Sequence, residues 1–120
     1  MKTKTIGDIG EEYAVNYLKK HRYKILSRNY RKRFGEIDII AEKKGTVAFV
    51  EVKTRRSDAF AEAKEFVGAA KQRRIRLAAS MWLASNETQL QPRFDVIEIY
   101  GTEQMRYRDL QIRQIENAFE

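Results

Sequence analysis

The sequence predicts an α/β protein in which a mixed β-sheet is flanked by helices. The first observation is a central stretch, residues 34–55, whose two arms are rich in β-branched and aromatic residues and are separated by a lysine and glycine turn. The second is that apolar residues recur at helical spacing on both sides of this stretch, near the N-terminus and again over residues 68–85. The resulting order of helix, three strands, helix and strand is typical of a layered α/β fold.

Composition favours a single domain, residues 1–120, with a basic surface. A hydrophobic content of 42% is enough for one core at this length, and the chain has one proline and no cysteine. No apolar run approaches the roughly 20 residues of a membrane span, so we expect no membrane partner and a cytoplasmic location. The formal charge of +7 and the pI near 9.7 favour a polyanionic partner such as nucleic acid, although a basic surface also keeps a domain dispersed.

The first predicted element is an amphipathic helix over Thr5–Lys20, in which apolar side chains recur every three or four residues. Glu11 and Glu12 lie near its middle, and the spacing alone does not say which of them faces the sheet. A turn at residues 21–22 and a strand over Tyr23–Tyr30 are expected to follow.

The central stretch is predicted to fold as a β-hairpin. Lys43, Lys44 and Gly45 supply polar turn chemistry with one residue that readily adopts a positive φ angle. If residues whose numbers add up to 89 pair across the hairpin, Asp38 lies opposite Glu51 and the connection is Lys44-Gly45 or a slightly longer loop in the same register.

Charged side chains inside this hairpin need an explanation, because charges between apolar strand residues are rarely placed there for stability. Asp38 is flanked by isoleucines, while Glu51 and Lys53 lie beside valines and share one face of their strand. Two opposed carboxylates destabilise a ladder unless a cation lies between them, so Asp38 and Glu51 are predicted to bind a divalent metal. Oxygen ligands favour Mg²⁺ or Mn²⁺ over zinc, for which one histidine and no cysteine leave few ligands. Glu36 is predicted to be an outer-shell ligand or an arginine partner.

The C-terminal half is predicted to add a helix and a strand. The polar segment Arg56–Val67 is expected to form a loop with some helical character, and Gly68–Ser85 an amphipathic helix. Phe94–Tyr100 alternates as a strand with Met105–Arg108 as a candidate pairing partner, and Asp95 within it is interpreted as a structural hydrogen-bonding residue. Apolar residues of the tail are expected to cap the core, namely Ile112, Ile115, Ala118 and Phe119.

Two groups of basic residues are predicted to contact phosphates. Eight lysines and arginines and no acidic residue occur between Lys19 and Arg33. Four more crowd the first turns of the helix Gly68–Ser85, where the helix dipole favours acids. A solvated face is the alternative for both groups. The residues predicted to bind nucleic acid are Arg31, Lys32, Arg33, Arg55, Lys71, Arg73, Arg74 and Arg76.

At these residues the sequence resembles a known family. The matching segments are Gly10-Glu11-Glu12, Gly35-Glu36-Ile37-Asp38, Phe49-Val50-Glu51-Val52-Lys53-Thr54-Arg55 and Arg93-Phe94-Asp95-Val96. They resemble the YraN-like family of predicted endonucleases, within the PD-(D/E)xK superfamily, and are similar to archaeal Holliday junction resolvases. One position departs from the superfamily motif, since Ile37 stands where its name has a proline.

The resemblance implies a restriction-endonuclease-like core and a Mg²⁺- or Mn²⁺-dependent endonuclease acting on nucleic acid, with DNA, including branched or structured DNA, as the expected substrate. It favours Glu11 over Glu12 as a third metal ligand beside Asp38 and Glu51. It also implies that the Lys53 ammonium orients the attacking water and stabilises developing negative charge. Resolvases of similar fold act as dimers, so a homodimer is a further expectation.

Two other interpretations of the same residues remain open. In the first, the chain is a non-catalytic nucleic-acid-binding module with a degenerate nuclease site, which binds DNA without cutting it. In the second, it is a scaffold in which Glu51 and Lys53 form a buried structural ion pair.

Overall fold

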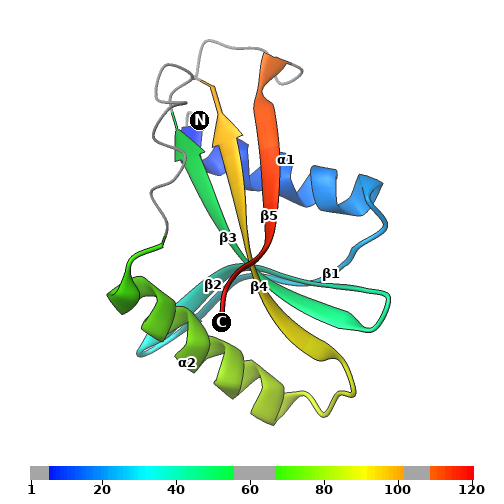
Figure 1. Cartoon of the computed structure of the whole chain (residues 1–120), viewed down its shortest axis with the longest axis vertical. Helices are drawn as coiled ribbons and strands as arrows, with labels where there is room; N and C mark the ends of the chain where they lie inside the picture. Colours follow the sequence, from blue (N-terminus) through cyan, green and yellow to red (C-terminus); the bar gives the residue numbers. More distant parts are fainter. Residues whose placement is uncertain (1–5, 56–66, 102–108) are drawn as a thin grey trace, which may run out of the picture.

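The computed structural model describes residues 6–55, 67–101 and 109–120, and in them the chain forms a five-stranded sheet with two helices (Figure 1). The elements in chain order are α1 (Ile6–Lys20), β1 (Lys24–Lys32), β2 (Gly35–Lys43), β3 (Thr46–Arg55), α2 (Ala69–Ser85), β4 (Gln91–Tyr100) and β5 (Gln111–Phe119). This mixed α/β architecture confirms the predicted fold class and is consistent with a restriction-endonuclease-like core.

The strands lie in the sheet in the order β1-β2-β3-β4-β5. Only β3 and β4 are parallel, because α2 crosses over between them, and the other neighbours are antiparallel. The β2–β3 register runs from Lys43↔Thr46 to Ile39↔Val50, and the two turn residues Lys44 and Gly45 have φ angles of 47° and 83°. Two positive φ angles are what a type I′ hairpin turn requires. The predicted hairpin register and connection are therefore confirmed.

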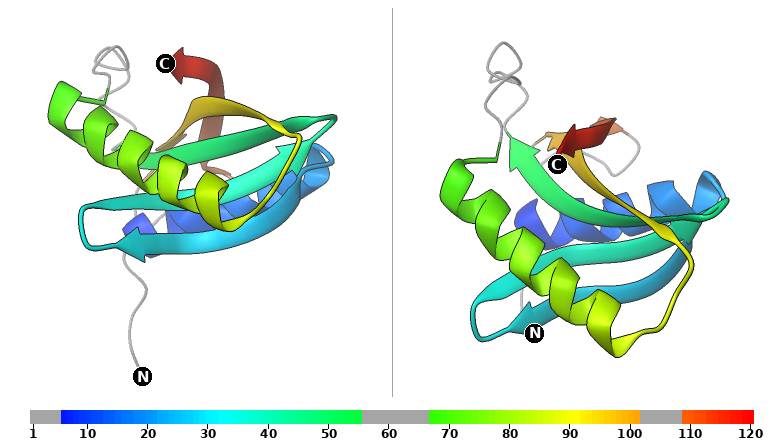
Figure 2. Two further views of the ribbon diagram at one scale, coloured as in Figure 1. Left: turned by 90° about the horizontal axis from the view of Figure 1, so that it is seen from below. Right: turned by 60° about the horizontal axis from the view of Figure 1, so that its bottom comes forward.

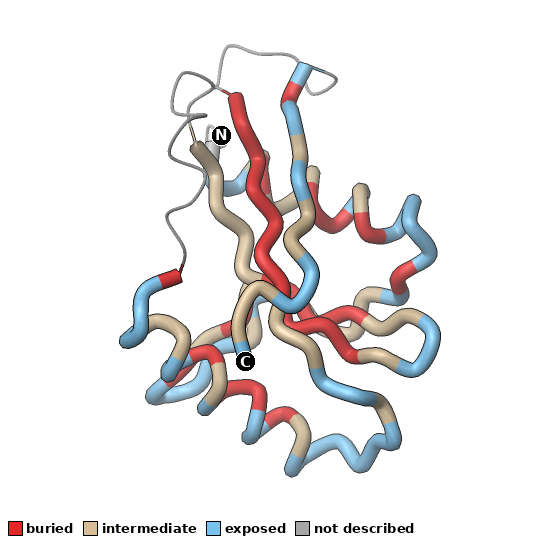
Figure 3. Tube along the Cα trace, viewed as in Figure 1, coloured by how far each residue is buried: buried red, intermediate tan, exposed pale blue. Residues whose placement is uncertain are grey.

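The two helices cover opposite faces of the sheet, as the turned views in Figure 2 show. On one face Ala14, Val15 and Leu18 of α1 pack in one buried cluster with β2, β3 and β4. On the other face Ile75 and Ala78 of α2 belong to a second cluster. Both helices are amphipathic at the predicted positions, and Figure 3 shows buried and exposed residues alternating along them. Burial of these apolar faces holds the three layers together.

The sheet opens between β2 and β3 at the end opposite the hairpin turn. Their ladder ends at Ile39↔Val50, whereas β3 stays paired with β4 as far as Arg55↔Tyr100. Figure 1 shows β3 continuing beside β4 and β5 while β2 curves away toward α2. Residues just beyond this point, Asp38 and Glu51 among them, therefore line the place where the two strands separate.

The C-terminal tail differs from its predicted role. Its apolar residues do pack on the core, but they do so as a fifth strand that pairs with β4 rather than as a cap. The β4–β5 register shifts between Phe94 and Val96, and Asn117 has a φ angle of 53°, so the alternation that identifies a strand is interrupted. The predicted loop at residues 56–66 and the predicted pairing segment within residues 102–108 lie outside the described residues. No described helix is long and apolar enough to cross a membrane.

Candidate active site

Asp38 occupies an irregular position of β2. Ile37 packs in the cluster on the α2 side, whereas Ile39 packs in the cluster on the α1 side, so the alternation of the strand breaks at Asp38. The β1–β2 register places Asn29, with a φ angle of 52°, opposite it. Freed from the ladder with β3, the Asp38 carboxylate accepts a hydrogen bond of 2.8 Å from the backbone N–H of Val52.

Glu51 of β3 shares this position with Asp38. Only 12% of the Glu51 side chain is exposed, and its Oε2 atom is buried without a hydrogen-bond partner. Burial, then the neighbouring Asp38 charge, raises the pKa of Glu51 to about 8. Burial also raises the pKa of Asp38, although the Val52 N–H and a hydrogen bond with the Glu51 carboxyl oppose the shift. The sequence-predicted pair is thus brought together, and the raised pKa of Glu51 favours its protonated form near neutral pH in the metal-free protein.

A lysine from α2 reaches into this pair. The Lys71 ammonium donates a hydrogen bond of 2.9 Å to Glu36 Oε1 and lies 3.8 Å from Glu51 Oε1. Burial alone would lower the pKa of Lys71, but the hydrogen bond to Glu36 and the nearby carboxylates raise it. The same hydrogen bond lowers the pKa of Glu36, which also lies 3.9 Å from Arg31. Glu36 therefore makes its shorter contact with Lys71 and its longer one with Arg31, whereas the sequence predicted an outer-shell ligand or an arginine partner.

Lys53 lies two residues after Glu51 on β3, and its side chain is partly exposed. Among the described residues, no carboxylate lies within ion-pair distance of its ammonium group. The buried Glu51–Lys53 ion pair of the scaffold interpretation is therefore not formed. The cation beside Glu51 is Lys71 instead.

Glu11 faces the same region from α1, which approaches β3 closely at Gly10. A Cβ atom at Gly10 would lie 2.8 Å from Cγ2 of Thr54, so only glycine lets the helix approach this far. Burial and then Asp38 raise the pKa of Glu11, whereas Arg28 and Asn29 lower it. One of its oxygens, Oε1, is buried without a hydrogen-bond partner.

Glu12 lies beside Glu11 at a cavity of about 230 Å³. The cavity is lined by Asp8, Glu11, Glu12, Arg28 and Asn29. The Asp38 charge acts on the pKa of Glu11, so the Glu11 carboxylate lies near the candidate site, and the preference for Glu11 over Glu12 stays a prediction.

The carboxylates present fit a magnesium-type ion better than a metal held by protein ligands alone. Within residues 6–55, 67–101 and 109–120, no group of three or more acidic, histidine or cysteine side chains is close enough to form a metal site. Mg²⁺ is usually held by one or two carboxylates and keeps several waters. Asp38 and Glu51 supply two, and the unpartnered Glu51 Oε2 offers a free ligand atom.

The predicted nucleic-acid-binding residues divide into two groups. Three of them are half-buried and have partners within the protein: Lys71 binds Glu36, Arg55 lies 3.5 Å from the buried Glu98, and Arg76 donates to Gln72 and to the Glu120 carbonyl. The others are exposed, namely Arg31, Lys32, Arg33, Arg73 and Arg74, and of these Arg31 also lies 3.9 Å from Glu36.

Asp95 of β4 is fully buried, yet its surroundings satisfy it. Arg93 donates two hydrogen bonds of 2.8 Å to its two oxygens, Gln114 donates one of 3.0 Å, and the Asn117 backbone N–H donates one of 2.9 Å. Arg93 and Gln114 also donate to Tyr23 Oη. The interpretation of Asp95 as a structural residue is confirmed, with Arg93 as the charged partner that sequence reasoning did not identify.

Lys71 is the site residue that sequence reasoning missed, since it was grouped with the phosphate-contacting cations. Lys71 shares its one sequence signal with the other cations at the start of α2. It lies in the first turn of α2, where the helix dipole disfavours a cation unless a carboxylate offsets it, and Glu36 and Glu51 are the acids on neighbouring elements.

The sequence matches the model of the family described as "Uncharacterised protein family UPF0102" over residues 10–99. It is 50% identical to the UPF0102 protein of Geobacter metallireducens over 119 residues, which are 98% of this chain and 93% of the relative. It is 49% identical to the UPF0102 protein of Alkaliphilus oremlandii over 97% of this chain and 98% of the relative. The UPF0102 protein of Caldicellulosiruptor saccharolyticus is 42% identical over 99% of this chain and 100% of its own length.

Proposed function

The chain belongs to the UPF0102 family, and we propose that it is a metal-dependent nuclease that hydrolyses phosphodiester bonds of nucleic acid. DNA, branched or structured DNA included, is the proposed substrate. The order of Asp38 on one strand and Glu51 and Lys53 on the next supports a place in the PD-(D/E)xK superfamily.

The observation that carries this proposal is the repulsion between the poorly solvated carboxyls of Asp38 and Glu51. Folding buries the two carboxyls side by side, raises the pKa of both and leaves Glu51 Oε2 without a partner. Such an arrangement costs stability in the free protein, because the two carboxyls ionise together only against their mutual repulsion in a poorly solvated position. A divalent cation would relieve the repulsion, so the arrangement is suited to binding a metal ion.

In the proposed mechanism Asp38 and Glu51 would hold a Mg²⁺ or Mn²⁺ ion, with Glu11 as a third carboxylate acting on it through water. The ion, when bound, lowers the pKa of a coordinated water and neutralises the phosphate. The Lys53 ammonium orients the attacking water and stabilises the negative charge that develops on the phosphate oxygens. Water adds to phosphorus, the P–O bond to the leaving sugar oxygen breaks, and the proton that the water loses is balanced by the proton that the leaving oxygen takes up from solvent. Lys71 acts differently, because it holds Glu36 and offsets part of the charge of Glu51.

A non-catalytic nucleic-acid-binding module is the second candidate, and Lys71 favours it. Its ammonium lies 3.8 Å from Glu51 and already supplies one positive charge beside the pair. If that charge is sufficient, the site has no need of a metal and binds nucleic acid without cutting it.

The test is incubation of purified protein with single-stranded, duplex, flap and four-way DNA in Mg²⁺ or Mn²⁺. Cleavage of at least one substrate is expected, and Asp38→Asn, Glu51→Gln and Lys53→Ala should each reduce its rate by about 100-fold or more. Binding should survive in all three variants, since phosphate contacts elsewhere dominate affinity.

Glu42→Gln is the matched control, because it removes the same charge from β2 near the hairpin turn, where Glu42 pairs with Val47. Its cleavage rate should equal that of the wild type. Binding without cleavage in the wild type would favour the second candidate, and cleavage that persists in the Asp38 and Glu51 variants would contradict the assignment of the site.

A further inference from the structure

The tip of the β1–β2 hairpin exposes an aromatic ring beside the candidate active site. Phe34 is 64% exposed, the most exposed large apolar residue described, and Leu77 of α2, which lines the same cavity, is 47% exposed. Phe34 and Leu77 thus form one exposed apolar patch with a polar rim, and such a patch is a common feature of ligand-binding grooves.

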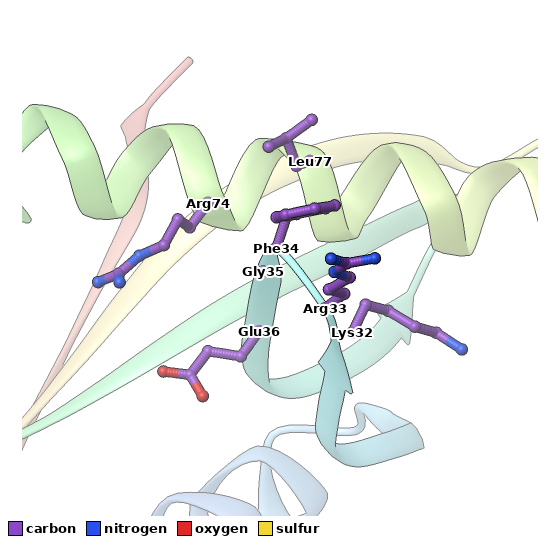
Figure 4. A pocket seen from close by; sticks show the side chains of 7 residues that line it. All are labelled: Lys32, Arg33, Phe34, Gly35, Glu36, Arg74 and Leu77. Atoms are coloured by element: carbon purple, nitrogen blue, oxygen red, sulfur yellow. The ribbon is translucent and has the colours of Figure 1, made fainter.

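The hairpin tip is fixed against α2 by Gly35. A Cβ atom at this position would overlap the Arg74 carbonyl oxygen and lie 3.2 Å from the Ala78 Cβ, so only glycine allows this contact. Phe34 is therefore held next to the helix, and Figure 4 shows its ring between the hairpin tip and Leu77. A ring held in place loses little conformational entropy when a ligand stacks on it.

Between the hairpin tip and α2 lies a cavity of about 490 Å³, within the size range of sites for small organic ligands. Its walls combine apolar and positively charged groups. They are formed by Lys32, Arg33, Phe34, Gly35, Glu36, Arg74 and Leu77 (Figure 4). The Arg33 guanidinium lies 5.1 Å from the centre of the Phe34 ring. A planar ring rimmed by three cations suits a ligand with a flat apolar part and a negatively charged part.

The cavity adjoins the carboxylate pair through Glu36. Glu36 lines the cavity and accepts the hydrogen bond of Lys71, whose ammonium lies 3.8 Å from Glu51 Oε1. Glu36 is two residues before Asp38 on β2, which is about 7 Å along the strand, so a nucleic-acid strand whose phosphate reaches Asp38 and Glu51 would have its next nucleotides at the edge of this cavity.

We infer that the Phe34–Leu77 cavity binds one unpaired nucleotide of the substrate, with its base stacked on Phe34 and its phosphates on Lys32, Arg33 and Arg74. This inference rests on the proposed function and deepens it. It means that the site selects nucleic acid with an unpaired or flipped base next to the cleaved bond, because a base inside a duplex cannot reach a ring on a hairpin tip. A second copy of this chain is the competing occupant, and the positive rim disfavours it because two such faces repel each other.

The test is equilibrium binding in EDTA, where no cleavage occurs, of two duplexes that differ only in one unpaired 2-aminopurine nucleotide. The wild-type protein should prefer the duplex with the unpaired base by about 5- to 100-fold, the range expected for stacking one base on an aromatic side chain. Quenching of 2-aminopurine fluorescence on binding reports the stacking directly. Phe34→Ala should lose both the preference and the quenching while keeping its affinity for the fully paired duplex, and Phe34→Trp should keep both.

Met81→Ala is the matched control, because Met81 is 44% exposed on α2 but does not line the cavity. It should behave as the wild type, and melting curves should show all three variants folded. A Phe34→Ala protein that retains the preference and the quenching overturns the inference. So does sedimentation that shows a wild-type dimer converted to a monomer by Phe34→Ala, since the ring then belongs to a contact between copies. A wild-type protein that cuts DNA without the preference contradicts this inference alone, whereas one that shows the preference but never cuts contradicts only the proposed function.

Discussion

Asp38 on β2 and Asp95 on β4 are aspartates of the same sheet, but they differ in the number of hydrogen-bond donors around the carboxylate. Asp95 accepts four hydrogen bonds, two from an arginine, one from an amide side chain and one from a backbone N–H. Asp38 accepts one from the Val52 N–H and otherwise faces a second carboxyl, that of Glu51. The fold therefore supplies a full set of hydrogen-bond donors to the carboxylate of Asp95 but not to that of Asp38.

The difference separates a structural role from a ligand-binding role. The Asp95 network joins β4 to β5 and, through Arg93 and Tyr23, to the start of β1. Removing one member of such a network leaves the others buried without partners. The Asp38–Glu51 pair is incomplete in the free protein, so its neutralisation removes a repulsion rather than a contact. The same change of side chain should consequently have opposite effects at the two positions.

The largest expected effect comes from Asp95→Asn compared with Asp38→Asn. Asp95→Asn should lower the free energy of unfolding by about 3–5 kcal/mol, because Arg93 loses its buried charged partner. Asp38→Asn should leave it unchanged or raise it in the metal-free protein. Urea unfolding in EDTA measures both. Equal destabilisation by the two substitutions would contradict a structural role for Asp95 and a ligand-binding role for Asp38.

A second prediction concerns pH, through Glu51. Its pKa rises from 4.5 in the unfolded chain to about 8 in the folded protein, so between these values the folded state binds more protons than the unfolded state. The free energy of unfolding therefore falls as pH rises through this window, by up to about 1.4 kcal/mol per pH unit for this group. Asp38 contributes in the same direction, and Glu36, whose pKa is lowered from 4.5, contributes in the opposite direction only below this window.

Glu51→Gln isolates this contribution. The difference between the wild type and Glu51→Gln in metal-free unfolding should grow in favour of the variant from pH 5 to pH 8. A difference that is constant over this range would mean that Glu51 titrates normally and that the pair holds no proton.

A third prediction compares the two lysines of the site. Lys71→Met should lower the free energy of unfolding of the metal-free protein by about 1 kcal/mol, a modest amount because Glu36 is 44% exposed. Lys53→Met should change it by no more than about 0.5 kcal/mol, since the ammonium has no described carboxylate within ion-pair distance. The opposite order in thermal melts would restore the scaffold interpretation, in which Lys53 stabilises Glu51.

The smallest expected effect separates exposed cations from those with internal partners. Replacing Arg31, Lys32 and Arg33 by alanine should flatten the slope of log affinity against log salt by up to about 2.7 on duplex DNA, roughly 0.9 for each phosphate contact. Arg76→Ala should change it by less than one contact, because its guanidinium donates to Gln72 and the Glu120 carbonyl. An unchanged slope in the triple variant would mean that these side chains contact no phosphates and form only a solvated surface.

Local patterns predicted much of the fold and one part of the site. The hairpin register followed from turn chemistry at Lys44-Gly45, and that register is enough to bring Asp38 close to Glu51. β5 was missed because Ile112 and Ile115, which are three residues apart, face opposite sides of the sheet, and because the register shift and the positive φ angle of Asn117 interrupt the alternation further along the strand. A rule based on strict alternation does not detect a strand of this kind.

The remainder of the site depends on contacts distant in the sequence. Lys71 is 35 residues from Glu36, and Gln114 is 19 residues from Asp95, so neither pairing has a local signature. Charge alone does not distinguish Lys71 from the exposed cations of α2. Only packing of α2 against β2 decides which of these cations turns inward.

The most direct test of the central claim is whether a divalent cation stabilises the protein through the Asp38–Glu51 pair. Unfolding at pH 7.5 should be measured in EDTA and at rising Mg²⁺ or Mn²⁺ concentrations, for the wild type, Asp38→Asn, Glu51→Gln and the control Glu42→Gln. The wild type and the control should gain about 2.7 kcal/mol at a metal concentration 100 times the dissociation constant, and the two site variants should gain little. A wild-type protein that the metal does not stabilise, or site variants that gain as much as the wild type, would contradict the account.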